Sequence, residues 1–142
     1  MHGPQKVNTM ELNYNTAEKA LQAAKEKALS MNIPVSISVV DAGGHLIALA
    51  RLNSVYGVID FAIKKAKTAV MFGVDSDVMG SIISETGIHG YGMLNSNEGL
   101  LTIAGGVVLK NEEGKIIGGI GSSGGTPEQD KEIAEAGAHA IA

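Results

Sequence analysis

Apolar residues recur every three to four positions in several stretches of the chain, a spacing that places them on one face of a helix. This pattern predicts helices over about 16–31, 58–72 and 75–83. A last helix is predicted to begin at Pro127, with Ile133, Ala136, Ala140 and Ile141 on its apolar face. The lysines of the first two helices fall mainly on the opposite faces, which indicates helices that pack one side against a core.

Strand-like segments lie between these helices. Residues 35–41 alternate apolar and small polar side chains, and a turn at Ala42-Gly43-Gly44 joins them to 45–52, which predicts an antiparallel hairpin. Three further strands are predicted at 100–104, 107–110 and 115–121. The Gly-rich segment Ser84–Glu98 is expected to be a long loop, and long loops in compact domains often carry function.

The order of these elements predicts one domain covering residues 1–142, of the α+β class. Its sheet is expected to have five strands, with helices on at least one face. Residues 1–13 form a polar lead that is expected to be loosely ordered.

The stretch Gly118–Asp130 predicts a buried strand that turns through glycines into a capped helix. Thr126 suits the N-cap and Pro127 the first helical position, while Gln129 completes a capping box. A glycine corner before a helix can hold an anion, but no phosphate-binding motif is present. Close backbone packing is therefore the favoured interpretation.

Composition and charge restrict the possible functions. The formal net charge of -4 gives no electrostatic reason to expect binding to nucleic acid or acidic lipid. The chain has no Cys, which excludes disulfides, thiolate metal sites and Cys nucleophiles. No apolar run is long enough to span a bilayer, so no membrane association is expected and a cytoplasmic location is the default, with an already removed signal peptide left open.

Two histidines and a tyrosine are the candidates for chemistry. His45 adjoins the hairpin turn, and it is either a solvated turn residue or a ligand of metal or haem iron. His89, near Tyr91, could ligate iron or act with Tyr91 in acid–base catalysis, or it could be an ordinary loop residue. His139 is interpreted as a solvated residue near a helix end.

Lys64, Lys65 and Lys67 form a basic face on the second long helix. This face is either an ordinary solvated surface or, together with Arg51, a binding site for a carboxylate or propionate group.

Three blocks of sequence resemble the GlcG/HbpS family, which includes the C-terminal domain of PduO proteins. They are Val39–Leu46 with Arg51-Leu52-Asn53 after it, the helix segment Lys65–Ala69, and Gly105-Gly106 followed by Gly118–Asp130. The resemblance implies a profilin-like fold with an antiparallel sheet, and assembly into a homo-oligomer between tetramer and octamer. It also implies binding of haem, with a corrinoid as the other possible cofactor. The first helix has no His, so iron ligation is expected from His89 or His45.

Three functions follow as hypotheses. The first is a haem- or tetrapyrrole-binding protein with a role in haem or corrinoid handling or sensing. The second is an enzyme or sensor for an organic acid, with a cleft formed by residues from several segments: Arg51, Lys65, Thr68, His89, Tyr91, Gly105 and Gly106. The third is a structural assembly module, for which the Gly-rich, aromatic-poor composition is suitable.

Overall fold

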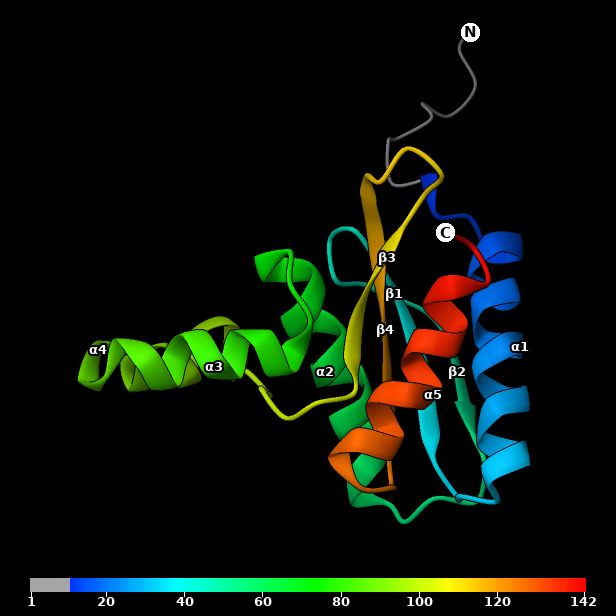
Figure 1. Cartoon of the computed structure of the whole chain (residues 1–142), viewed down its shortest axis with the longest axis horizontal. Coiled ribbons are helices and arrows are strands. Elements are labelled where there is room, and N and C mark those ends of the chain that lie inside the picture. The colour runs from blue at the N-terminus through cyan, green and yellow to red at the C-terminus, as the bar shows by residue number, and fades with distance from the viewer. Residues whose placement is uncertain (1–10) are drawn as a thin grey trace, which may run out of the picture.

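The computed structural model describes residues 11–142 and shows one α+β domain with a projecting helical arm (Figure 1). The predicted loose order of residues 1–10 lies outside the described residues. Residues 11–13 are fixed in place, because Leu12 is buried and Asn13 caps the first helix. The elements in chain order are α1 (Tyr14–Met31), β1 (Ser36–Asp41), β2 (Leu46–Arg51), α2 (Gly57–Phe72), α3 (Ser76–Thr86), α4 (Ile88–Gly92), the 3-10 helix η2 (Met93–Glu98), β3 (Gly106–Lys110), β4 (Ile116–Ser123) and α5 (Pro127–His139).

Within residues 11–142 the sheet has four antiparallel strands in the order β2-β1-β4-β3, so the prediction of five strands is wrong. The segment 100–104 is the strand that does not form. Its backbone bonds to helix side chains instead: the Leu101 N–H donates to Thr68 Oγ1, and Ser76 Oγ donates to the carbonyl of Ile103. These bonds keep the segment beside the helices, and pairing begins only at Gly106.

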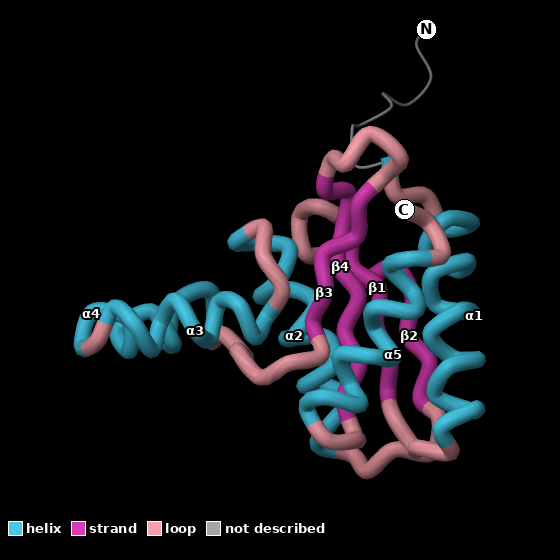
Figure 2. The backbone as a smooth tube through the Cα atoms, in the orientation of Figure 1, coloured by secondary structure: helices cyan, strands magenta, loops and turns pink. Residues whose placement is uncertain are grey.

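Helices cover both faces of the sheet (Figures 1 and 2). Helices α1 and α5 lie on one face, where Ile37, Val39 and Ile120 join their side chains in the main core. Helix α2 lies on the other face, against β1, β3 and β4. The core is built almost entirely of Ala, Val, Ile and Leu.

Glycines in β3 and β4 form the surface on which α2 rests. A β-carbon at Gly121 would overlap the backbone of Ala62, and one at Gly119 would lie 2.7 Å from the carbonyl oxygen of Ala66. The helix therefore packs by its backbone, which only glycine permits at these distances. This finding confirms close packing as a role of the Gly-rich stretch, and the predicted capping box of Thr126 and Gln129 is also present.

The segment Ser84–Glu98 is helical, so the prediction of a long loop is wrong. Helix α3 continues to Thr86, and α4 and η2 follow it. The glycines of this segment suggested a loop, but Gly90 has a packing role. It lies against the Ile83 carbonyl and the Thr86 side chain, where α4 packs on α3. Together α3 and α4 form the arm that projects away from the sheet (Figure 1).

No helix among residues 11–142 combines the length and the apolar character that crossing a membrane requires.

Candidate functional site

The predicted site residues lie in four separate places. Lys65, Thr68, Gly105 and Gly106 are neighbours between α2 and strands β3 and β4. The other candidates are distributed over the hairpin turn (His45), the end of β2 (Arg51) and the arm (His89 and Tyr91). The cleft predicted for the organic-acid hypothesis, which did not include His45, does not form within one chain.

Lys65 lies inside the protein, so the alternative that made it part of an ordinary solvated surface is wrong. Its side chain is only 2% exposed, and Nζ lies 3.1 Å from Asp130 Oδ2 and 3.0 Å from the carbonyl oxygen of Ser122. Gly105, at φ +129°, leaves room for the amine, since a β-carbon there would lie 2.9 Å from Nζ. Burial lowers the pKa of Lys65 below 10.5, although the Asp130 carboxylate acts to raise it.

A groove of about 240 Å³ opens beside this ion pair, and we call it the Lys65 groove. Its walls include the apolar side chains of Val58, Phe61 and Ile103 and the start of α5 at Pro127. Lys65 and Asp130 both line it. A buried amine and a carboxylate thus meet at the edge of an apolar hollow, an arrangement that can bind or exchange protons with a small polar molecule.

Thr68 and Gly106 have structural partners. Thr68 Oγ1 accepts from the Leu101 N–H, and the Gly106 N–H donates 2.9 Å to Ser76 Oγ. Both bonds attach the segment before β3 to the helices, and this segment contributes Ile103 to the Lys65 groove.

His45 lies on the surface, paired with a carboxylate. Its Nδ1 is 3.3 Å from Asp41 Oδ1, and its side chain is 81% exposed. The same oxygen accepts from the N–H groups of Gly43 and His45, both at 2.9 Å, so Asp41 caps the hairpin turn. With Nδ1 facing Asp41, the Nε2 atom is left to bind a ligand or a metal ion.

The His45 groove, of about 270 Å³, joins the hairpin turn to the C-terminal half of α2 and to the end of η2. Lys67 and Met71 line it together with His45. The side chain of Lys67 extends toward Gly44 of the turn. An imidazole, an ammonium and a thioether therefore share one open hollow.

Arg51 lies on the edge strand β2, away from both grooves. Its Nε and Nη2 donate to the carbonyl of Ser54 at 3.1 and 2.8 Å, and its guanidinium stacks 4.9 Å above the centre of the Tyr56 ring. Two of its donors are thus already used within the chain.

His89 and Tyr91 lie exposed on α4, in the arm. Ile88 beside them is 81% exposed and Tyr91 is 60% exposed. From the arm they contact neither Lys65 nor Arg51. Within one chain they therefore do not share a cleft with these two residues, as the organic-acid hypothesis required.

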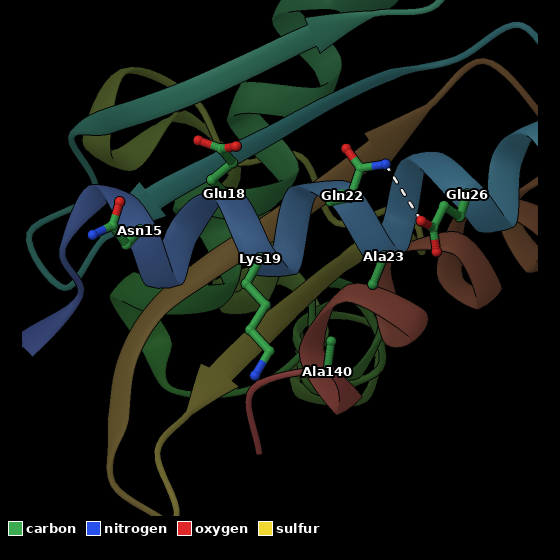
Figure 3. Close-up of a pocket in the computed structure, with 7 residues that line it drawn as sticks. All are labelled: Asn15, Glu18, Lys19, Gln22, Ala23, Glu26 and Ala140. Atoms are coloured by element: carbon green, nitrogen blue, oxygen red, sulfur yellow. Dashed lines mark hydrogen bonds between the residues drawn. The ribbon is translucent and has the colours of Figure 1, made fainter.

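The largest of the grooves runs along α1 and measures about 500 Å³ (Figure 3). Polar side chains border it, among them Glu18, Lys19 and Glu26, with Ala140 on the far side. None of its seven lining residues is a His, so it offers no imidazole to iron. In the part of the chain from 11 to 142, no group of three or more His, Cys, Asp or Glu side chains is placed to hold a metal ion.

Sequence reasoning missed Asp130 as the partner of Lys65. Asp130 is 65 residues from Lys65 in the chain, and only the packing of α2 and α5 against β4 brings the two together. No local pattern could have paired them.

The comparison with protein families decides the relationship of the chain. The family model described as "Haem degrading protein HbpS-like" matches residues 12–139. The chain belongs to the HbpS-like family. The resemblance inferred from the three sequence blocks is thereby confirmed.

Relatives of this HbpS-like chain include a 15.0 kDa protein of the dhaT–dhaS intergenic region of Citrobacter freundii, at 35% identity over 95% of this chain and 94% of the relative. The corrinoid adenosyltransferase PduO of the same organism is 34% identical over 93% of this chain. The chain spans only 39% of that longer protein. Among solved structures, a PduOC:heme complex has a TM-score of 0.82 and 30% identity, covering 92% of this chain and 94% of its own.

Proposed function

We propose that this protein binds haem, with His45 as the iron ligand. The observation that carries the proposal is the similarity, over nearly the whole chain, to a structure solved as a PduOC:heme complex. Membership of a family described as haem degrading gives independent support.

Three side chains of the His45 groove are of the kinds that contact haem. Haem requires an axial ligand for iron, contact with an apolar ring and partners for two carboxylates. His45 supplies an imidazole, Met71 supplies apolar surface, and Lys67 supplies a positive charge. Among the candidate histidines, His45 has a carboxylate against its other ring nitrogen and a basic side chain in the same groove.

The chain's own residues then act by orientation. Asp41 is fixed by two backbone N–H groups and in turn holds Nδ1 of His45, which directs Nε2 outward. Lys67 would meet a propionate. Bound haem would supply redox chemistry at iron, and the exposure of His45 leaves that chemistry accessible to solvent.

Titration with haemin tests this assignment. We expect a Soret band to develop with the native protein and haem affinity to fall about tenfold or more in His45→Ala, while His89→Ala binds as the native protein does. Loss of the band in His89→Ala with retention in His45→Ala would overturn the choice of ligand. No Soret change with the native protein would overturn haem binding itself.

The same titration with aquocobalamin tests the corrinoid alternative, which the likeness to part of PduO supports. A spectral change that requires His45 and exceeds the response to haemin would favour the corrinoid. A role in handling or sensing either cofactor is part of the proposal.

We further propose that the protein forms a homo-oligomer, between tetramer and octamer, through the arm. The arm exposes apolar side chains on α3 and α4, among them Val78, Ile82, Ile88 and Tyr91. Light scattering after gel filtration is expected to give an oligomer for the native chain and a smaller species for Ile88→Glu.

If the native protein binds no ligand yet assembles, the structural-module hypothesis gains support. The cytoplasmic location stays a prediction.

A further inference from the structure

The Lys65 groove has features that haem binding at His45 does not use. Its floor holds the one lysine among residues 11–142 that is almost fully buried, paired with an almost fully buried aspartate. An ammonium has three N–H donors, and the carbonyl of Ser122 and the carboxylate of Asp130 account for two of them. Among residues 11–142 the third N–H has no bonded acceptor, and the Lys65 side chain lines the groove.

The surroundings determine the kind of acceptor. Lys65 and Asp130 together carry no net charge, and the nearby walls of Val58, Phe61 and Ile103 are apolar. A carboxylate ligand would approach Asp130 closely and be repelled, whereas a neutral carbonyl compound would not. The volume of about 240 Å³ suits a molecule of a few carbon atoms.

We infer that Lys65 is a reactive amine that forms an imine with a small aldehyde or ketone bound in this groove. A lysine in a desolvated, apolar hollow is the usual setting for this chemistry, because the uncharged amine is the nucleophile. The lowering of the Lys65 pKa by burial is consistent with it. The inference does not depend on haem binding.

The reaction balances with the groups present. The Asp130 carboxylate takes a proton from the ammonium, and the free amine forms a C–N bond to the carbonyl carbon. The carbonyl oxygen then takes a proton from the attacking nitrogen and becomes a hydroxyl group. Asp130 gives its proton to this hydroxyl group, which leaves as water as the C=N bond forms. The sum is one lysine ammonium and one carbonyl compound giving one protonated imine and one water.

Trapping with a reducing agent tests the inference on the full chain. The protein is treated briefly with propanal and sodium cyanoborohydride near neutral pH, and the propylated lysines are located by peptide mass mapping. We expect the propyl group on Lys65 before it appears on Lys64, the adjacent and more accessible lysine. An equal or slower reaction at Lys65 would overturn the inference.

Three variants separate a reactive site from a structural ion pair. Ile103→Trp narrows the groove without touching the pair and is expected to abolish the adduct at Lys65. Asp130→Asn is expected to slow it about a hundredfold, at the low end of general acid–base contributions. Lys64→Met, the matched control, is expected to leave the rate at Lys65 unchanged. Should Asp130→Asn fail to fold, Ile103→Trp still decides: an undiminished adduct there contradicts a site in the groove.

Discussion

Lys65 with Asp130 and His45 with Asp41 are two pairs of a basic group and a carboxylate, set beside the two halves of helix α2. Their contact distances are similar, at 3.1 and 3.3 Å, but their exposures are not. The side chains of the first pair are 2% and 3% exposed, whereas His45 is 81% exposed. Water solvates the exposed imidazole, while the buried lysine depends on its partner and on one carbonyl.

Burial, more than distance, therefore decides what such a pair can do. The exposed pair can hold an imidazole in one orientation toward an incoming ligand. The buried pair links α2, β4 and α5, and it alters the proton affinity of its amine.

Removing one member of the buried pair is expected to give the largest effect. Asp130→Ala leaves a buried ammonium without its counter-charge, and the free energy of unfolding should fall by about 3–5 kcal/mol. Urea denaturation measures the loss. The double variant Lys65→Met/Asp130→Leu removes both charges and should recover most of it; a double variant as unstable as Asp130→Ala would show that shape, not charge, matters here.

Moving α2 away from the glycines of β3 and β4 should open the Lys65–Asp130 pair to water, as the His45–Asp41 pair already is. Gly121→Ala places a methyl group against the backbone of Ala62, and unfolding free energy is expected to fall by about 1–3 kcal/mol. Gly57→Ala, at the start of the same helix, adds its methyl group in open space and should cause no loss. Equal stability of the two variants would argue against backbone packing of α2.

The exposed pair should affect stability less and binding more. Asp41→Ala removes the acceptor of two turn N–H groups, which should cost about 1 kcal/mol. It should also weaken haem binding about tenfold, since His45 loses its orienting partner. His45→Ala is the control for stability and should stay within about 0.5 kcal/mol of the native protein. Both quantities come from urea denaturation and haemin titration; unchanged haem affinity in Asp41→Ala would contradict an orienting role.

The smallest expected effect is the pH dependence of stability that the buried pair causes. Burial lowers the pKa of Lys65 from 10.5, so between the folded pKa and 10.5 the unfolded chain binds more protons than the folded one. The contribution of Lys65 to stability therefore rises with pH in that window. We expect the difference in urea midpoint between the native protein and Lys65→Met/Asp130→Leu to move in favour of the native protein as pH rises from neutral toward 10.5. A difference that stays constant or moves the other way would contradict the lowered pKa of Lys65.

Local signals in the sequence predicted well. Thr126 and Gln129 specify their helix start within four residues, and Asp41 closes its turn on the N–H groups of residues nearby, so both roles could be predicted without tertiary structure. The hairpin of β1 and β2 was predictable for the same reason.

Features set by distant contacts were not predictable. Residues 100–104 have the composition of a strand, but the hydroxyls of Thr68 and Ser76 capture their backbone groups. Gly90 signalled a loop, but it serves the packing of α4 on α3. Lys65 looked like a member of a solvated face until the fold supplied Asp130. The sequence therefore grouped candidate residues that the fold separates.

Because α2 packs on glycines, the side chains in its two grooves can change independently during evolution. Because the contacts of the helix with β3 and β4 are made largely by main-chain atoms, its position does not depend on which side chains it presents to solvent. Mutations at Phe61 or Met71, one in each groove, can alter one hollow while the helix stays in register. Ligand preference at the two ends of α2 is thus free to evolve separately on one rigid platform.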